Sequence, residues 1–333
     1  MQQRESLRGR SVLVTGSAGF IGSHLVDALV MEGARVRAFV RYNSRRSRGW
    51  LDDLDAELSE QIEFFAGDIR DGLTVERAVE GSEIVFHLAS LIAIPYSYDA
   101  PEAYVATNVA GALNVLNACR RHGVSRLVHT STSEVYGTAQ RVPIDEHHPL
   151  HPQSPYAATK SAADQLALSF CASFGTPVVV IRPFNTYGPR QSLRAVIPTI
   201  AAQLLAGGPV RLGSVTPSRD FTYVGDTVQG FLRAATSLGV EGSTVQLGSG
   251  HEISIEELAK LIAEVIGTPL RIEHDPQRVR PRASEVERLV ADASLAKKLL
   301  HWRPEIELRE GLQRTVDWLR RQPVAERAAE YAQ

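Results

Sequence analysis

A tyrosine and a lysine four positions apart, Tyr156 and Lys160, have the types and spacing for acid–base chemistry. On a helix, this spacing puts both side chains on one face, one turn apart. A free phenol has a pKa of about 10, so a phenolate base near neutrality needs a depression of about three units, or about 4 kcal/mol. A neighbouring ammonium group lowers a phenol pKa in this way. The pair predicts a general base for a substrate hydroxyl, although an exposed helix face would show the same pattern.

Three polar residues follow an apolar stretch at 125–130 that we expect to be a strand; they are Thr132, Ser133 and Glu134. Open α/β sheets place their ligands at the carboxyl ends of the strands. At such an edge, Glu134 could remove a carbon-bound proton, and the two hydroxyls could hold or protonate an oxygen. The alternative is that these residues only cap the next segment, with Glu134 in solvent.

The elements that position these residues start with a strand at 11–15, a glycine-rich turn and a helix to about residue 31. In this order, glycines allow a tight turn and let backbone amides approach a pyrophosphate at the helix N-terminus. The spacing is G-x-x-G-x-x-G instead of the commoner G-x-G-x-x-G. We expect a dinucleotide here in preference to a plain turn, with contacts from Gly16, Ala18, Gly19, Phe20, Ile21 and Gly22.

The strand expected at 35–40 bears on the choice of cofactor. An NAD-preferring site usually ends this strand in an acid that binds the adenosine ribose. Here Arg41 follows the strand, with Asn43 and Ser44 behind it and no acid nearby. Because an arginine can pair with a 2′-phosphate, NADP is slightly favoured over NAD; a solvated basic turn with bound NAD is the alternative. The strands expected at 62–65 and 84–88 should add the cofactor contacts Asp68, Ile69, Leu88, Ala89 and Ser90.

Length and composition indicate a soluble globular protein. The chain has 333 residues, 44% apolar and 22% charged, which suggests about two domains. A net charge of −2 gives no reason to expect nucleic acid as a partner. No apolar run approaches the ~20 residues of a membrane span, and the first strand leaves no room for a signal peptide. Cys119 and Cys171 lie in helical patterns without a metal-ligand cluster, so we expect a cytoplasmic protein with no metal and no membrane partner.

The predicted fold class is α/β, a Rossmann doubly wound parallel sheet with a smaller C-terminal α/β substrate domain. The first domain is expected at 1–182 with a return near 222–250, and the second at 183–221 and 251–325. Helices near 101–122 and 153–174 carry more apolar surface than solvent-facing helices need. We therefore expect a homodimer through them, with ordinary sheet packing as the alternative.

Polar residues beyond the last predicted strand of the sheet, at 177–181, suit a second diphosphate, that of a sugar nucleotide. Each could be a plain surface residue, but arginine and amide side chains together can bind phosphate oxygens. The apolar loop 91–99 is long enough to reach such a substrate. The predicted substrate contacts are Ile94, Asn185, Arg190, Arg219 and Arg280.

Six ordered motifs make the chain similar to the extended short-chain dehydrogenases/reductases of the NAD(P)-dependent nucleotide-sugar epimerase/dehydratase family. They are Thr15-Gly-x-x-Gly-Phe-Ile-Gly22, Phe86-His-Leu-Ala89, Thr132-Ser-Glu-Val-Tyr-Gly137, Ser154-Pro-Tyr-x-x-x-Lys160, Arg182-Pro-Phe-Asn185 through Tyr187-Gly-Pro189, and Arg219-Asp-Phe. Within the family, the chain most resembles 4,6-dehydratases of the legionaminic-acid pathway, which act on a nucleotide-linked N-acetylglucosamine. The shared features are the 92–97 loop and the 195–198 segment. The resemblance implies a homodimer. Val196 and Ile197 are further predicted substrate contacts, and recognition of the base is expected to depend on the backbone and loop shape at 196–199 and 210–212, which no motif encodes.

The resemblance also implies a reaction cycle. Tyr156 deprotonates the sugar 4-hydroxyl while hydride passes from C4 to the nicotinamide of a tightly bound NADP or NAD, and Thr132 bonds the same oxygen. Glu134 removes the acidified C5 proton, water leaves from C6, and the hydride returns there to give a 4-keto-6-deoxy sugar. The dTDP-glucose dehydratases have an Asp at the position of Ser133 as the acid for the leaving hydroxyl. A serine is not acidic enough for this role alone, so Glu134 is expected to shuttle the proton.

Other functions stay open. A UDP-glucuronate decarboxylase resembles the 132–137 segment but usually lacks Ser-Pro before the tyrosine and ends strand two in an acid; it ranks second. A 4-epimerase would use Tyr156 and Lys160 alike but has no need for a carbon base such as Glu134. A non-catalytic NAD(P)-binding scaffold is disfavoured by the complete set of candidate catalytic residues. The sequence does not fix the sugar, the nucleotide, or NAD against NADP.

Overall fold

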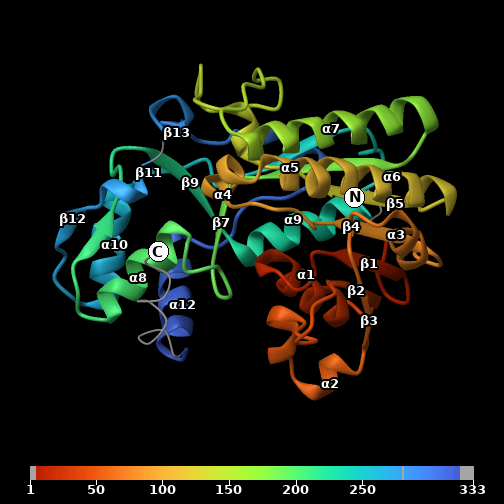
Figure 1. Ribbon diagram of the computed structural model, residues 1–333, viewed down its shortest axis with the longest axis horizontal. Helices are drawn as coiled ribbons and strands as arrows, with labels where there is room; N and C mark the ends of the chain where they lie inside the picture. Colours follow the sequence, from red (N-terminus) through yellow and green to blue (C-terminus); the bar gives the residue numbers. More distant parts are fainter. Residues whose placement is uncertain (1–4, 280, 323–333) are drawn as a thin grey trace.

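Seven parallel strands form the central sheet of the computed structural model, which describes residues 5–279 and 281–322. Their order across the sheet is β10-β6-β5-β4-β1-β2-β3 (Figure 1). Since β1 pairs with both β2 and β4, the winding direction reverses between β1 and β4. This doubly wound sheet confirms the predicted Rossmann fold. The strands are β1 (Ser11–Thr15), β2 (Arg35–Arg41), β3 (Ile62–Gly67), β4 (Ile84–His87), β5 (Arg126–Thr130), β6 (Val178–Pro183) and β10 (Thr244–Leu247).

Helices cover both faces of this sheet, which explains why its central strands are continuous apolar runs instead of alternating ones. Every residue of β4 and of β6 is buried. One face carries α1 (Phe20–Met31), α9 (Val224–Thr236) and α11 (Ser294–Leu300). The other face carries α3 (Gly72–Val79), α6 (Gly111–Arg121) and α7 (Pro155–Phe174).

Helix α7, predicted at 153–174, has clear sequence signals at both ends. The Ser154 side chain accepts a hydrogen bond from the Ala157 amide at 3.1 Å, Pro155 occupies the first turn, and Gly175 ends the helix in the left-handed region. The helix predicted at 101–122 is a continuous helical stretch made of α5 (Pro101–Tyr104), the π-helix η2 (Val105–Ala110) and α6, so only the π segment was not predicted. Part of the expected loop 91–99 forms α4 (Ile94–Asp99). Across the described chain, no helix combines the length and apolarity that crossing a membrane requires.

The remaining long elements gather beside the sheet, on the left in Figure 1. Helices α8 (Val196–Leu205), α10 (Ile255–Ile266) and α12 (Leu308–Arg320) pack around a second apolar core. Strand β9 (Ser218–Tyr223) pairs with β7 (Asn185–Tyr187), β11 (Glu252–Ser254) and β13 (Arg288–Leu289), and β8 (Val210–Leu212) pairs with β12 (Ile272–His274). The short elements are α2 (Ala56–Ser59) and the 3-10 turns η1 (Gly49–Asp53), η3 (Ser133–Tyr136), η4 (Pro276–Arg278) and η5 (Arg282–Ser284). The domain boundaries given above stay a prediction.

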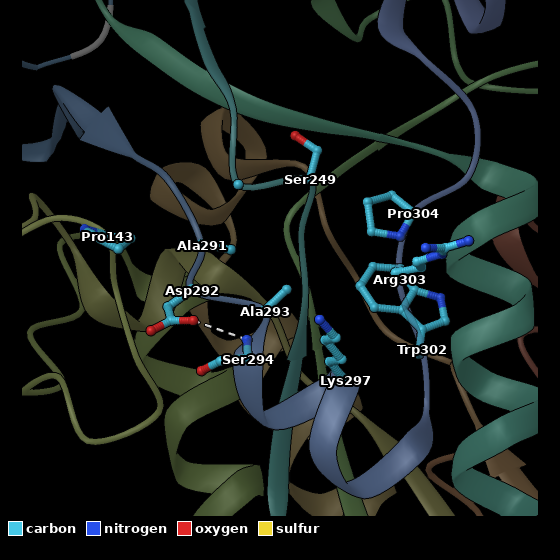
Figure 2. Close-up of a pocket in the computed structure, with 11 residues that line it drawn as sticks. Pro143, Ser249, Ala291, Asp292, Ala293, Ser294, Lys297, Trp302, Arg303 and Pro304 are labelled. Carbon is cyan, nitrogen blue, oxygen red and sulfur yellow. Dashed lines mark hydrogen bonds between the residues drawn. The ribbon is translucent and has the colours of Figure 1, made fainter.

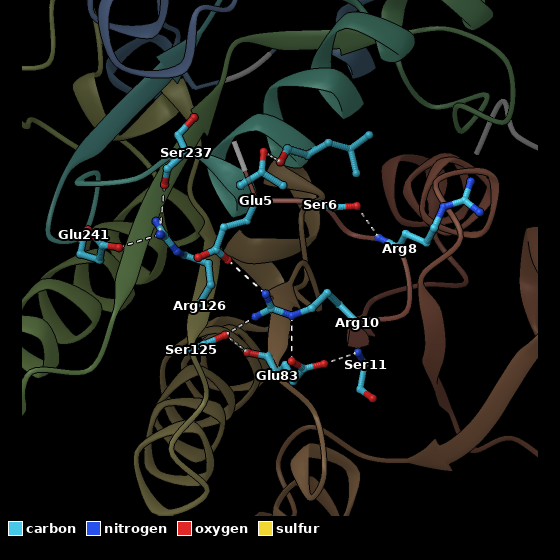
Figure 3. A network of polar contacts seen from close by, with 12 residues as sticks. Glu5, Ser6, Arg8, Arg10, Ser11, Glu83, Ser125, Arg126, Ser237 and Glu241 are labelled. Carbon is cyan, nitrogen blue, oxygen red and sulfur yellow. Dashed lines mark hydrogen bonds and ion pairs between the residues drawn. The ribbon is translucent and has the colours of Figure 1, made fainter. Parts of the chain in front are cut away.

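The amino ends of the central strands are closed by charged side chains (Figure 3). Arg10, just before β1, forms ion pairs with Glu5 at 3.1 Å and with Glu83 at 2.8 Å. Arg126, at the start of β5, pairs with Glu241 at 2.6 Å. These charged side chains form ion pairs with one another, so we assign the amino edge of the sheet a structural role. The polar side chains that could do chemistry lie at the opposite, carboxyl edge.

Candidate active site

The predicted acid–base residues converge where β5 ends beside α7. Thr132 caps the turn η3, and its hydroxyl accepts a hydrogen bond from the Glu134 amide at 3.2 Å. The Thr132 side chain also acts on the phenol of Tyr156 and lowers its pKa, whereas the charge of Glu134 raises it. Thr132 and Glu134 are partly exposed, whereas Ser133 is buried. A hydroxyl, a carboxylate and a phenol therefore meet at one point of the sheet edge.

Tyr156 is buried in a small cluster of apolar and aromatic side chains. It packs with Ile94 of α4 and with Tyr104, whose ring is 6.3 Å away in an edge-on arrangement. Burial raises the pKa of Tyr156, the Thr132 side chain opposes this rise, and the charge of Glu134 adds to it. The sequence predicted a lowered pKa. In the chain by itself, burial outweighs the groups that would lower it.

Lys160 lies one turn after Tyr156 and is almost fully buried. Its Nζ atom donates a hydrogen bond to the carbonyl oxygen of Thr130 at 2.5 Å. Burial lowers the pKa of Lys160 to about 8, although the charge of Asp164 opposes this fall. At neutral pH the side chain is therefore mainly an ammonium, the form that favours a neighbouring phenolate.

The glycine-rich turn lies at the switch point between β1 and β4. A Cβ atom on Gly22 would lie 2.1 Å from the Gly16 carbonyl oxygen, and one on Gly16 would lie 2.7 Å from the Ala89 amide nitrogen. The Thr15 hydroxyl accepts hydrogen bonds from the Leu88 and Ala89 amides, both at 3.2 Å. No side chain in the described residues caps α1, and its first turn carries no acid. This close backbone approach and the uncapped helix N-terminus fit a dinucleotide pyrophosphate at Gly16, Ala18, Gly19, Phe20, Ile21 and Gly22.

The residues predicted for the adenosine end lie after β2 and β3. The Asn43 side chain donates to the carbonyl oxygens of Arg41 at 3.1 Å and Ser47 at 2.8 Å, so it shapes the turn. Arg41 and Ser44 are exposed, and the charge of Arg41 acts on Asp68. Hydrogen bonds from Arg70 are the main cause that lowers the pKa of Asp68 to about 2, so this carboxylate is ionised. Ile69 is buried beneath it, whereas Leu88, Ala89 and Ser90 are partly exposed at the tip of β4.

The residues predicted to bind substrate do not form a single cluster of free side chains. Asn185 donates to the Asp220 carbonyl oxygen at 3.3 Å, Arg190 pairs with Asp27 of α1 at 2.7 Å, and Arg219 pairs with Glu285 at 3.3 Å. The two arginines thus have carboxylate partners within the chain. Val196 starts α8 and Ile197 is buried in the second core, so a contact from Ile197 would have to come from its backbone. Arg280 lies outside the described residues.

Sequence reasoning missed Asn108, which supports the site from the π-helix η2. Its side-chain oxygen accepts from the Leu91 amide at 2.8 Å, and its amide nitrogen donates to the Leu91 carbonyl at 3.0 Å and to Thr159 at 3.1 Å. These bonds fasten the chain just before Ile94 to helix α7. A π-helix does not follow the 3.6-residue period, so the hydrophobic pattern gave no signal for this residue.

An open pocket of about 370 Å³ lies elsewhere, between the loop after β10 and the start of α11 (Figure 2). Ser249, Asp292, Lys297 and Arg303 are among its lining residues. Its lining, as described, contains no residue predicted for catalysis or cofactor binding. The pocket is therefore separate from the site at the end of β5.

Comparison with known proteins decides the family. A family model described as GDP-mannose 4,6 dehydratase matches residues 13–315. The chain belongs to this family of extended short-chain dehydrogenases/reductases. A UDP-glucose 4-epimerase of Mycolicibacterium smegmatis is 36% identical over 314 residues, covering 92% of this chain and 98% of the relative. A dTDP-glucose 4,6-dehydratase of an Actinoplanes species is 34% identical over 316 residues, covering 93% and 97%.

The solved structures agree with this extended short-chain dehydrogenase/reductase assignment. The structure of a dTDP-glucose 4,6-dehydratase from Streptomyces venezuelae, with NAD bound, has a TM-score of 0.84 and 31% identity. It covers 93% of this chain, which covers 97% of that one. Dehydratases and epimerases are thus similarly close to this family member, so the geometry of its own residues must separate the two activities.

Proposed function

We propose that this protein is a nucleotide-sugar 4,6-dehydratase that converts UDP- or GDP-N-acetylglucosamine to the 4-keto-6-deoxy sugar. The observation that carries the proposal is the position of Glu134, a carboxylate beside the Tyr156 phenol. Elimination of water requires a base for a carbon-bound proton in addition to the base for the 4-hydroxyl. Oxidation and reduction at C4 alone, as in a 4-epimerase, require only the second.

In the proposed reaction, Tyr156 takes the proton of the sugar 4-hydroxyl while Thr132 bonds the same oxygen. Lys160, as an ammonium, favours the phenolate form of Tyr156. The 4-ketone then makes the C5 proton acidic, and Glu134 removes it. Ser133 is buried and not acidic enough to protonate the leaving 6-hydroxyl, so Glu134 delivers the proton to that oxygen. The C6–O bond breaks, water leaves, and C5 later regains a proton from solvent through Glu134.

A dinucleotide held by the glycine turn completes the proposal. When bound, its nicotinamide accepts a hydride from C4 of the sugar and returns it to C6. Because the cofactor is regenerated in each turnover, we expect it to stay bound through purification. NADP is slightly favoured over NAD, since Arg41 is exposed at the end of β2 and no acid lies at that position.

The substrate diphosphate is proposed to bind near Asn185, Arg190, Arg219 and Arg280. Asn185 and Arg219 lie on the paired strands β7 and β9, which supports a shared face for them. Two further proposals are a cytoplasmic location and a homodimer formed through the 101–122 and 153–174 segments. Val105 and Phe174, on these segments, are 52% and 53% exposed.

The test is product mass. The purified protein is incubated without added cofactor with UDP-N-acetylglucosamine, GDP-N-acetylglucosamine, dTDP-glucose, GDP-mannose and UDP-glucuronate. Loss of one water from any of the first four supports a dehydratase and identifies its substrate. Loss of carbon dioxide from the glucuronate would support the decarboxylase instead. A product of unchanged mass with a changed retention time would support a 4-epimerase, the alternative ranked after the decarboxylase, which the similarity to an epimerase favours.

A further inference from the structure

A buried aspartate lies one turn beyond Lys160 on α7. Asp164 has no exposed surface, and its Oδ2 atom accepts hydrogen bonds from the Ser131 hydroxyl at 2.5 Å and from Arg182 at 3.0 and 3.2 Å. Its Oδ1 atom lies 3.5 Å from His129 Nε2. The aspartate thus joins α7 to the ends of β5 and β6. A buried carboxylate held this way is well ordered.

Three consecutive residues at the end of β5 contact three residues spaced one turn apart on α7. Thr130 accepts from Lys160, Ser131 donates to Asp164, and Thr132 acts on the phenol of Tyr156. This arrangement fixes the register between the strand end and the helix. Of the three contacts, the one between Ser131 and Asp164 is the most deeply buried. It can therefore fix the positions of Lys160 and Tyr156 relative to the end of β5.

The titratable and charged side chains around Lys160 and Asp164 lie on β4, β5, β6, η3 and α7. Burial lowers the pKa of His87 on β4 and of His129 on β5, so both are neutral at neutral pH. Arg182 on β6, Tyr136 on η3 and Tyr156 on α7 complete the set. Burial would raise the pKa of Asp164, but the nearby His129 ring and the charge of Arg182 outweigh it and lower that pKa. Asp164 is therefore ionised, and it is the group whose charge supports the ammonium of Lys160.

We propose that Asp164 is a positioning residue for the Tyr156–Lys160 pair, holding the end of β5 through Ser131 and supplying the negative charge that keeps Lys160 an ammonium at neutral pH. This inference rests on the proposed roles of Tyr156 and Lys160. A purely structural aspartate that only neutralises Arg182 would leave the ionisation of Lys160 unchanged. The two possibilities therefore differ in a quantity that can be measured without turnover.

The chain has only four lysines, Lys160, Lys260, Lys297 and Lys298, so each lysine Cε signal can be followed by NMR after isotope labelling. The signal missing from Lys160→Met identifies Lys160. In the protein as purified, its titration midpoint is expected near 8. In Asp164→Asn, which keeps the shape and removes the charge, the midpoint should fall by about one pH unit or more. Asp164→Glu should restore it to within about half a unit.

Two further variants keep the test decisive if Asp164→Asn does not fold. Arg182→Gln breaks the same ion pair but leaves the Asp164 charge uncompensated, so the Lys160 midpoint should rise. Asp226→Asn removes another buried carboxylate, which lies on α9 and accepts a hydrogen bond from the Ile306 amide at 3.0 Å, and should leave the Lys160 midpoint unchanged. Ser131→Ala should reduce kcat but should leave the titration midpoint of Lys160 unchanged.

An unchanged Lys160 midpoint in both Asp164→Asn and Arg182→Gln would overturn the inference. A falling midpoint in Arg182→Gln would also overturn it, since removing a nearby positive charge while Asp164 stays ionised can only raise the midpoint of Lys160. These outcomes do not depend on which nucleotide sugar reacts. Failure of the dehydratase assignment, seen as product mass, can therefore be told apart from failure of the Asp164 role.

Discussion

Lys160 Nζ donates to the carbonyl oxygen of Thr130 at 2.5 Å, which ties the helix carrying Tyr156 to the strand that ends at Thr132. The lysine is 4% exposed, and burial lowers its pKa from 10.5 to about 8. An ammonium in this position disfavours folding, because the charged form is less stable when buried. The buried ammonium that the proposed reaction uses therefore lowers the stability of the fold.

The first prediction concerns the stability of the Lys160→Met variant as pH rises. Between about pH 8 and 10.5 the unfolded chain binds more protons at Lys160 than the folded chain, so the wild-type free energy of unfolding gains roughly 3 kcal/mol across this window. The unfavourable contribution is fully present below pH 8. Lys160→Met has no such group, so the stability of the variant relative to wild type should decline as pH rises from 8 to 10. Denaturant melts at several pH values measure this, and a constant difference would contradict the pKa assigned to Lys160.

The second prediction separates the two proposed bases. Glu134→Gln should still oxidise C4 but should not eliminate water, so reduced nicotinamide should accumulate on the enzyme while product falls by at least about 100-fold. Tyr156→Phe should stop both steps, because the 4-hydroxyl proton has no acceptor. Absorbance of the reduced cofactor and product mass report the two steps separately. Normal dehydration by Glu134→Gln would show that the carbon base lies elsewhere.

The third prediction tests the glycine turn. Gly22→Ala would place a methyl group 2.1 Å from the Gly16 carbonyl oxygen, so the turn must move. We expect a loss of about 1–3 kcal/mol in stability together with at least about tenfold weaker dinucleotide binding. Gly208→Ala is the matched control, because its nearest contact is 3.9 Å away and the residue is exposed. Thermal melts and cofactor titration compare the variants, and equal behaviour of the two would argue against a close backbone approach.

The fourth prediction addresses the choice between NADP and NAD. Arg41 is exposed, and its charge acts on Asp68 at the tip of β3. If Arg41 binds a 2′-phosphate, Arg41→Ala should weaken NADP by about tenfold and leave NAD unchanged. Calorimetric titration of both cofactors measures the ratio. An unchanged ratio would mean that Arg41 points into water and that the NADP preference is wrong.

Much of the fold follows from local patterns. Apolar runs such as 178–181 predict buried parallel strands, and Ser154, Pro155 and Gly175 mark the ends of α7. The glycine turn and the Tyr156–Lys160 spacing are local as well, so the sequence could position both. The π-helix η2 could not be predicted, because its period departs from that of an α-helix.

The long-range partners could not be predicted, because they depend on the packing of distant elements. Arg190, for example, pairs with Asp27 of α1, a partner that no sequence pattern indicates. The sequence gives no signal that Asp164 is buried, since a single acidic residue on a helix is usually exposed. Its importance emerges only when β5, β6 and α7 bring Ser131, Arg182 and Lys160 around it.

The most direct test of the proposed elimination is isotope incorporation at C5. The nucleotide sugar found to react is converted in deuterium oxide, and the product is analysed by mass and by NMR. Removal of the C5 proton by Glu134, followed by protonation from solvent, predicts a product that has lost one water and carries one deuterium at C5. Water loss without deuterium at C5 would contradict the role of Glu134. A 4-epimer of unchanged mass with no solvent deuterium would contradict the dehydratase assignment itself.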